Sequence, residues 1–221
     1  DLVDHHTYVI AGDGCFMEGV SHEAASMAGH MRLGRLIVLF DDNSISIDGD
    51  TSLAVSDDIS GRFTAYGWQV LTADGHDMDA VSAAITAAKA DDRPSLIRCK
   101  TEIGKGAPTM AGTSKVHGAP LGADEIAGTR AALNWPYAPF EIPEDILQEW
   151  RKIGQNGQQA RLKWEERLKT APQKDRFEAA LSGDISATSD TAIGKMKTDL
   201  AANPQKLASR VASQKTIEAL V

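Results

Sequence analysis

Apolar residues in the first part of the chain form four short runs. They are TYVIA at 7–11, LIVLFDD at 36–42, WQVLTAD at 68–74 and PSLIRCK at 94–100. The second run is apolar until its closing acids, which is typical of a strand covered on both sheet faces. Segments with helical spacing separate the runs, at 17–31, 57–66 and 78–90. Strands alternating with helices of this length predict right-handed βαβ units, and therefore an α/β fold with a parallel sheet flanked by helices.

The pattern changes after position 100 and again after position 122. Residues 101–121 carry four glycines and two prolines, which indicates a functional loop rather than a plain connection. Beyond this loop we predict a mainly helical part, with helices at 122–133, 143–154 and about 158–170. The polar stretch LSGDISATSDT at 181–191 is typical of a linker, and a last helix is expected near 207–221.

Composition and charge exclude several classes of protein. The 221 residues are 42% hydrophobic and 24% charged, as in a soluble globular protein, and no apolar run approaches the ~20 residues that cross a membrane. Residues 1–122 hold 17 acids and 9 bases, whereas 123–221 hold 14 of each, so the acidic first part argues against binding nucleic acid. The two cysteines show no pairing pattern, which favours a cytoplasmic protein. The start lacks a signal-peptide pattern and runs almost directly into a strand, as expected of a fragment or a processed chain.

Polar residues follow two successive predicted strands where each strand ends. Gly12-Asp13-Gly14 follows the first, Asp41-Asp42-Asn43 closes the second, and 28 residues separate Gly14 from Asn43. One crossover of this length places both at the same edge of a parallel sheet, where ligands bind. Either motif alone is more often an ordinary turn or cap, but together they favour a hard-cation site. Mg²⁺ prefers oxygen ligands and is commonly bound by protein oxygens and substrate phosphates together. The glycines allow close approach of a phosphate, and the helix that follows offers N–H donors.

Four segments narrow the interpretation further. They are GDGCFMEGVSHEAASMAGH at 12–30, DDNSISIDGDT at 41–51, AYGW at 65–68 and VHGAPL at 116–121. In this order and spacing they resemble transketolase, a family of thiamine-diphosphate enzymes. The resemblance is strong over residues 8–121 and continues weakly to the predicted linker.

The resemblance implies that the chain binds thiamine diphosphate together with Mg²⁺ or Ca²⁺. Asp13 and Asn43 would hold the metal through their side chains, and Ile45 through its backbone carbonyl. Gly14 would donate its backbone N–H to the diphosphate, and Ile47 would pack against the cofactor rings.

Three further residues gain roles from the resemblance. His117 matches a histidine that contacts the diphosphate and a hydroxyl of the reacting sugar, which suits proton exchange or hydrogen bonding. Glu18 and Glu23 match acids that face a partner subunit, so a homodimer is expected. The family reaction transfers a two-carbon ketol unit from a ketose phosphate to an aldose phosphate in the pentose phosphate pathway, and sugar phosphates would be the substrates.

Part of the family machinery is expected outside this chain. Residues 1–182 would form the thiamine-diphosphate domain without its N-terminal part, and 183–221 an interdomain linker to an absent pyrimidine-binding domain. We therefore expect the chain alone to bind cofactor weakly and to lack ketol-transfer activity. Two alternatives stay open: another thiamine-diphosphate enzyme such as dihydroxyacetone synthase, and a non-catalytic regulatory or scaffold domain that retains the metal motif.

Overall fold

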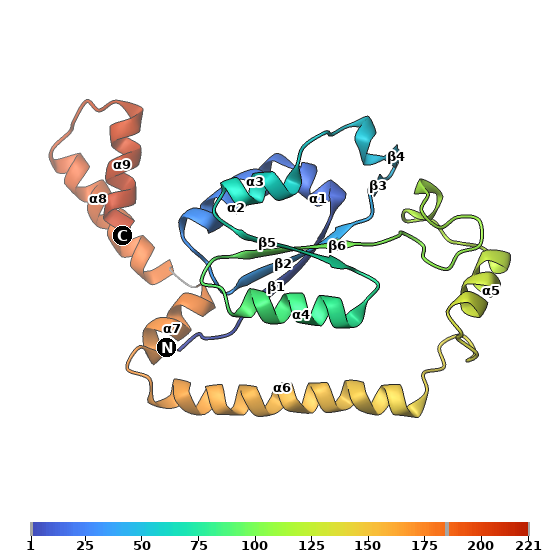
Figure 1. The fold of residues 1–221 in the computed structure, drawn as a ribbon. Coiled ribbons are helices and arrows are strands. Elements are labelled where there is room, and N and C mark those ends of the chain that lie inside the picture. The colour runs from blue at the N-terminus through green and yellow to red at the C-terminus, as the bar shows by residue number, and fades with distance from the viewer. Residues whose placement is uncertain (1, 184–185, 221) are drawn as a thin grey trace. The chain divides into compact units, whose positions relative to one another are not determined.

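The computed structural model describes residues 2–183 and 186–220 (Figure 1). Val3–Leu147 forms one compact unit, and the described residues from Gln148 onward form a second. The first unit contains β1 (Thr7–Gly12), α1 (Asp13–Met17), α2 (Gly19–His30), β2 (Leu36–Asp42), β3 (Ile45–Ser46), β4 (Gly49–Asp50), η1 (Thr51–Leu53), α3 (Ile59–Ala65), β5 (Gln69–Asp74), α4 (Met78–Lys89), β6 (Ser95–Lys100), η2 (Ser114–Val116) and α5 (Ala123–Ala132). Helix α6 (Glu144–Thr170) leads into the second unit, followed by α7 (Lys174–Ser182), α8 (Ser186–Ala202) and α9 (Ser209–Leu220).

A four-stranded parallel sheet forms the centre of the first unit, in the order β1-β2-β6-β5. In its register Gly12 lies opposite Asp41, and Asp42 lies opposite Lys100. Because the strands are parallel, their carboxyl ends meet at one edge, so the Gly-Asp-Gly and Asp-Asp-Asn motifs leave the sheet side by side. The predicted α/β fold with a parallel sheet flanked by helices is confirmed.

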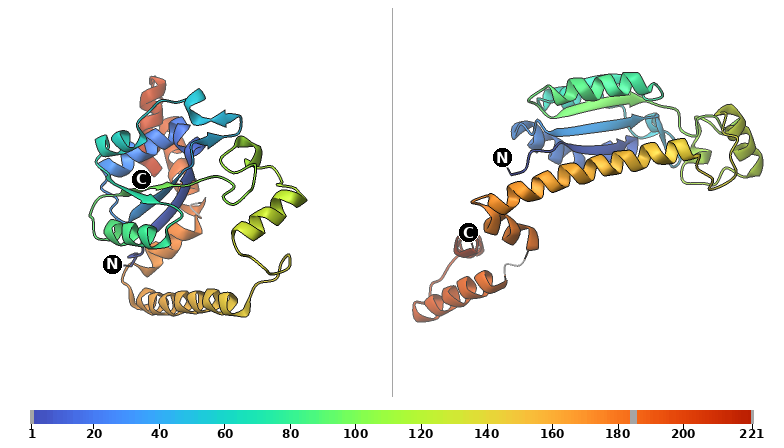
Figure 2. Two further views of the ribbon diagram at one scale, coloured as in Figure 1. Left: turned by 45° about the vertical axis from the view of Figure 1, so that its right-hand side comes forward. Right: turned by 90° about the horizontal axis from the view of Figure 1, so that it is seen from below.

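Alternate residues of the strands pack into a core on each face of the sheet. On one face Phe16, Phe40 and Phe63 meet edge to face in a cluster with residues of α1, α2 and α3. On the other face α4 packs over Ile37 and Ile97. Figures 1 and 2 show α4 on its own side of the sheet, opposite the other three helices. Burial on both faces explains why the segment 36–42 reads as a continuous apolar run.

Helix α2 approaches the turn after α3 very closely. Trp68, which is buried, donates its Nε1–H to the carbonyl of Ala25 at 2.8 Å. A Cβ added at Gly29 would lie 1.9 Å from the carbonyl oxygen of Tyr66, so no other residue fits there without a backbone shift. Gly29 therefore fixes how near α2 packs to the turn after α3.

The second unit consists of helices in the part of it that the structure describes. Helix α6 has 27 residues, and the rings of Trp164 and Phe177 bring it against α7 with centroids 6.0 Å apart. Helices α8 and α9 lie side by side (Figure 2). No helix within 2–183 or 186–220 combines the length and the apolar character needed to cross a membrane.

Four predicted elements need correction. The helix expected at 17–31 is interrupted at Glu18, whose φ of −70° and ψ of 134° are extended, so α1 ends before it and α2 begins after it. The helices expected at 143–154 and 158–170 are one helix, α6, which continues through Gly154 and Gly157. The polar break predicted at 181–191 is helical at 181–182, where α7 ends, and again from Ser186, where α8 begins, and its positions 184–185 lie outside the described residues. Serine, threonine and aspartate are residue types of low helix propensity, so this part of the sequence gives a weak helical signal.

Candidate cofactor and metal site

Asp13 is a buried carboxylate at the carboxyl end of β1. It is 8% exposed, and its Oδ2 accepts the backbone N–H groups of Asn43 and Ser44, both at 3.2 Å. Burial raises the pKa of Asp13 above its ordinary value of 3.8, and the negative charge of Asp42 raises it further, while the two N–H groups act in the opposite direction. Within the described residues no ion pair neutralises Asp13. A bound cation would relieve this electrostatic cost.

The turn after β2 brings Asn43 and Ser44 to this carboxylate. Asn43 Oδ1 accepts the N–H of Ile45 at 2.9 Å, and its Nδ2 donates to Asp41 Oδ2 at 3.3 Å. Ser44 has a left-handed φ of 62°, in the turn whose successive N–H groups both donate to Asp13. The amide oxygen of Asn43 keeps a second lone pair. The structure thus brings Asp13 and Asn43 together, as the strand order predicts, and adds Ser44, which no sequence pattern had indicated.

Strand β6 anchors the same turn from its other side. Asp42, 3% exposed, pairs with Arg98 and with Lys100 Nζ at 3.0 Å, and the hydroxyl of Thr101 donates to Asp41. Two cations therefore neutralise Asp42, in contrast to Asp13. The sequence analysis missed this network, although an arginine inside the otherwise apolar segment SLIRC was a usable signal.

The glycines that flank Asp13 are not required by the fold. Gly12 has a φ of −93°, and the φ of Gly14 is not positive. A Cβ at either position would meet no described atom within 4 Å. An alanine at either position would therefore fit without a clash within the described residues. Open space therefore lies beside Asp13, where the backbone can approach a bulky phosphate.

The glycine-rich loop after β6 carries His117. Gly104, Gly106, Gly112 and Gly118 have φ values of 66°, 90°, 70° and 73°, which other residues adopt only at a cost. His117 follows η2, and its exposed side chain makes no hydrogen bond within the described residues. No described contact joins it to Asp13, so its assignment to the site stays a prediction.

The remaining predicted residues lie around the same strand ends. Ile45 begins β3, and Ile47 lies in the β3–β4 turn with 73% of its surface exposed. Glu18 lies between α1 and α2, and Glu23 lies on α2. Both glutamates are exposed, and neither carboxylate has a hydrogen bond or ion pair within the described residues.

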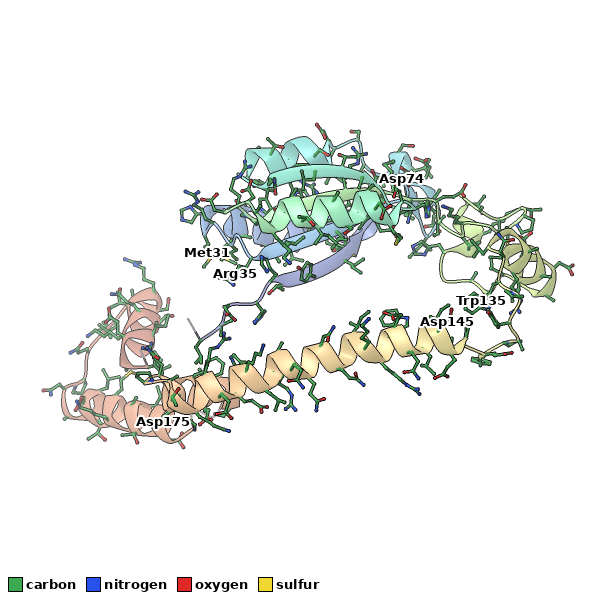
Figure 3. All side chains as sticks on the ribbon, turned by 60° about the horizontal axis from the view of Figure 1, so that its bottom comes forward. Met31, Arg35, Asp74, Trp135, Asp145 and Asp175 are labelled. Atoms are coloured by element: carbon green, nitrogen blue, oxygen red, sulfur yellow. The ribbon has the colours of Figure 1, made fainter. Side chains whose placement is uncertain are left out.

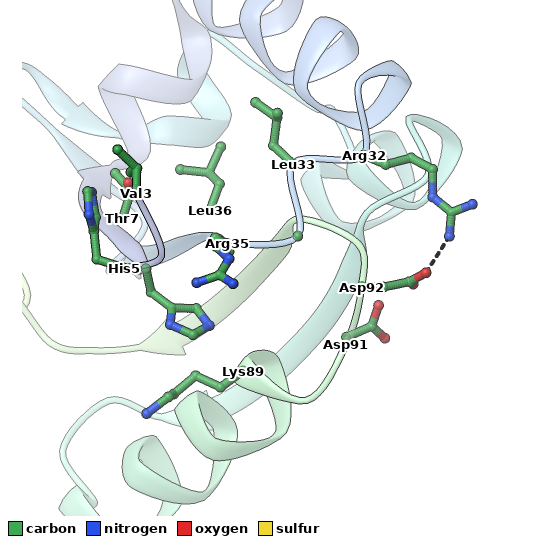
Figure 4. Close-up of a pocket in the computed structure, with 12 residues that line it drawn as sticks. Val3, His5, Thr7, Arg32, Leu33, Arg35, Leu36, Lys89, Asp91 and Asp92 are labelled. Carbon is green, nitrogen blue, oxygen red and sulfur yellow. Dashed lines mark hydrogen bonds and ion pairs between the residues drawn. The ribbon is translucent and has the colours of Figure 1, made fainter. Parts of the chain in front are cut away.

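Two cavities lie at opposite edges of the sheet. The larger, about 850 Å³, is at the amino ends of β1 and β2, and its lining includes Arg32 and Asp92, which pair with each other at 2.6 Å (Figure 4). The smaller, about 210 Å³, is at the carboxyl ends and is lined in part by Asp13 and Asp42. Figure 3 shows the two edges, with Arg35 at the first and Asp74 at the second. Ligands of open parallel sheets bind beyond the carboxyl ends, so the smaller cavity marks the candidate site.

The fold and this edge define an α/β protein that gathers carboxylate, amide and backbone groups at the carboxyl ends of a parallel sheet. Comparison with known proteins makes the class specific. Residues 1–189 match the family model described as "Transketolase, thiamine diphosphate binding domain". The chain therefore belongs to the transketolase thiamine-diphosphate-binding domain family.

Individual relatives agree with this assignment. The chain is 53% identical to a transketolase of Cereibacter sphaeroides over 214 aligned residues. The alignment covers 97% of this chain and 32% of the relative. It is 50% identical to transketolase 1 of Aliivibrio fischeri, over 99% of this chain and 34% of the relative. The crystal structure of transketolase from Campylobacter jejuni superposes with a TM-score of 0.79 at 34% identity, over 91% of this chain and 34% of that chain. The chain thus spans about a third of the length of the curated relatives it matches.

Proposed function

We propose that this chain is the diphosphate-binding part of a transketolase that transfers a two-carbon ketol unit from a ketose phosphate to an aldose phosphate in the pentose phosphate pathway. The names of the relatives support this reaction class. Two solved Pichia stipitis transketolases, 38% identical to this chain, are titled as complexes with fructose-6-phosphate and sedoheptulose-7-phosphate, which supports sugar phosphates as substrates.

One observation carries the proposal: the buried carboxylate of Asp13 lies between two glycines, lines the cavity at the ligand-binding edge of the sheet, and is neutralised by no ion pair within the described residues. We assign Asp13, Asn43 and the carbonyl of Ile45 as ligands of Mg²⁺ or Ca²⁺. The donor set fits, because hard divalent cations prefer carboxylate, amide and carbonyl oxygens. The space at Gly12 and Gly14 fits the diphosphate, with the Gly14 N–H as a donor to it.

Thiamine diphosphate, when bound, supplies the carbanion chemistry of carbon–carbon cleavage. The chain's own residues bind and orient the reactants. Ile47, which is exposed, offers an apolar surface for the cofactor rings. His117 is assigned to hydrogen bonding or proton exchange at a sugar hydroxyl, and its exposed side chain, which has no hydrogen bond within the described part of the chain, supports that role.

The outer surface of α2 supports a homodimer in the complete protein. Val20, Met27 and Met31 are 72%, 61% and 58% exposed and follow helical spacing, so they form an apolar stripe without a partner within the described residues. Glu18 and Glu23 lie beside this stripe in sequence. We assign both acids to the subunit interface.

The extent of the domain and the cell compartment are also proposals. We assign residues 1–182 to the thiamine-diphosphate domain without its N-terminal part and 183–221 to an interdomain linker. Exposure of Tyr8, Val9 and Ile10 on β1, at 49%, 39% and 81%, supports further chain packing on this strand. Free thiols at Cys15 and Cys99 support a cytoplasmic location.

Activity of the isolated 221 residues is the direct test of this assignment. We expect a highly purified sample of this chain to transfer no ketol group between pentose phosphates, whereas the full native chain that carries it transfers the group with Mg²⁺ and thiamine diphosphate present. Transfer by the isolated chain would contradict the proposal that part of the machinery lies elsewhere. Absence of transfer by the full native chain would contradict the assigned reaction.

A further inference from the structure

Arg62 on α3 joins three separate parts of the first unit. Its Nη2 donates to the carbonyl of Phe16 in α1 at 3.0 Å. Its Nη1 lies 2.8 Å from His22 Nε2 on α2 and 3.2 Å from Asp57 Oδ2 in the loop before α3. The guanidinium therefore bridges α1, α2 and α3 at the point where the chain leaves α1.

The contact with Phe16 lies where α1 most needs an external partner. The chain turns extended at Glu18, so the carbonyls of the last turn of α1 have no continuing helix to accept from. Arg62 supplies a charged donor to one of them, and a cation is also favoured at the negative end of a helix. Because α1 has only five residues and opens with Asp13, a displacement of its last turn would also displace the carboxylate.

The charge of Arg62 is held inside the protein. Its side chain is 13% exposed, and its buried Nε has no hydrogen-bond partner within the described residues. Asp57, 51% exposed, is its counter-ion, and the ring nitrogen of His22 must accept because a guanidinium only donates. An arginine kept in such surroundings is expensive to bury unless its fork makes several directed bonds.

Arg62 also shares the cavity of about 210 Å³ with Asp13. We propose that Arg62 is a positioning residue that clamps the end of α1 to α3 and so holds Asp13 in the geometry needed to bind the metal and the cofactor diphosphate. Arg62 acts through the backbone of α1 and contacts neither ligand. This inference rests on the proposed function, since it concerns the same Asp13.

Two variants of Arg62 and one control test the clamp in the full native chain. Arg62→Met removes all the polar contacts at similar length, and Arg62→Lys keeps the charge but loses the fork. Arg93→Met removes an arginine that pairs with Asp91 at the amino edge of β6. Titration calorimetry measures the affinity for Mg²⁺ and for thiamine diphosphate, and steady-state kinetics give kcat and the KM of the sugar phosphates at saturating cofactor.

We expect Arg62→Met to weaken cofactor binding by about 10–100-fold, Arg62→Lys to lie between it and the parent, and Arg93→Met to bind as the parent does. Saturating cofactor should restore kcat, because the reacting groups are unchanged, while the KM of the sugar phosphate stays constant. A purely structural role would instead lower the melting temperature and leave both affinities unchanged well below it. That result overturns the proposal.

The remaining outcomes also separate the two proposals. If Arg62→Met does not fold, Arg62→Lys and His22→Ala test the clamp instead, because each retains some of the contacts of Arg62. Unchanged affinity for Mg²⁺ and thiamine diphosphate in both variants overturns the inference. If the parent chain itself shows no Mg²⁺-dependent binding of thiamine diphosphate, the proposed function fails and the clamp role fails with it. Parent binding with unaltered Arg62 variants rejects the clamp alone.

Discussion

The two edges of the central sheet differ in a way that cavity size does not reveal. At the amino edge the cavity is about 850 Å³, yet the Arg32–Asp92 pair on its rim is exposed and neutralises itself. At the carboxyl edge the cavity is about 210 Å³, but it holds a buried carboxylate with a raised pKa. Charge that the fold leaves uncompensated is costly, so it is better evidence of a ligand than empty volume.

Truncation of an assigned metal ligand at the carboxyl edge should reduce cofactor affinity far more than a substitution at the amino edge. Asn43→Ala removes the amide oxygen next to Asp13 and should weaken Mg²⁺-dependent binding of thiamine diphosphate by about 100-fold or more. Lys89→Met changes the lining of the larger cavity and should leave binding within about twofold of the parent, as for most surface substitutions. Calorimetric titration of the full native chain checks both variants, and equal losses would remove the distinction between the edges.

Gly14→Ala should separate the effect of this edge on cofactor binding from its effect on folding. A Cβ at Gly14 meets no atom of the described residues within 4 Å, so thermal unfolding should be unchanged or the stability raised by up to about 1 kcal/mol, as for glycine to alanine in a helix. The same methyl group would enter the space assigned to the diphosphate and should reduce affinity about tenfold or more. Unchanged affinity would show that this space is not the diphosphate site.

Gly29→Ala is the matched substitution, and unlike Gly14→Ala it should destabilise the fold. Its Cβ would lie 1.9 Å from the carbonyl of Tyr66, so α2 must shift, and we expect a loss of about 1–3 kcal/mol in the free energy of unfolding. Urea unfolding of both glycine variants measures the contrast. A stable Gly29→Ala protein would contradict the close packing of α2.

Asp13→Asn should stabilise the protein in the absence of metal and cofactor. The amide can still accept the N–H groups of Asn43 and Ser44 but carries no charge to bury, so a gain of roughly 0.5–2 kcal/mol is expected near neutral pH. The folded-state pKa of Asp13 is raised above 3.8, so its ionisation opposes folding. The gain should therefore disappear as the pH falls below that ordinary value and grow as the pH rises through the raised pKa. Thermal melts across this range measure it, and a gain that does not vary with pH would contradict the cause given.

The smallest effect is expected at the exposed ion pair of the amino edge. Arg32 and Asp92 side chains are 67% and 78% exposed, so water and salt screen their attraction. Arg32→Met should change the free energy of unfolding by about 0.5 kcal/mol or less. A larger loss, measured by urea unfolding, would mean that this edge is more tightly organised than its exposure indicates.

Local patterns predicted the sheet and the meeting of Asp13 with Asn43, because strand runs and one crossover length determine both. The break at Glu18 was not predicted: the carbonyl of Phe16 just before it accepts from Arg62, which lies 46 residues away in sequence, and such a contact leaves no local pattern. The continuity of α6 through Gly154 and Gly157 was not predicted either. Each glycine disfavours a helix by about 1 kcal/mol relative to alanine, but the helix-forming residues on both sides outweigh this cost. The turn at Ser44 required knowledge of which carboxylate its N–H would meet.

The boundary at 182–183 and the site roles of His117, Ile47, Glu18 and Glu23 stay predictions. Packing within the described chain does not test them, because their assigned partners are a cofactor and a second subunit. Each lies exposed at its surface, where sequence resemblance rather than contact assigns the role.

The most direct test of the central claim is titration of thiamine diphosphate into the full native chain with and without Mg²⁺, comparing the parent with Asp13→Asn. We predict Mg²⁺-dependent binding by the parent and a loss of about 100-fold or more in the variant, which remains folded and melts at a higher temperature without ligands. Equal affinity of the two proteins, or parent binding that does not depend on Mg²⁺, would contradict the assignment of Asp13 as the metal ligand of this edge.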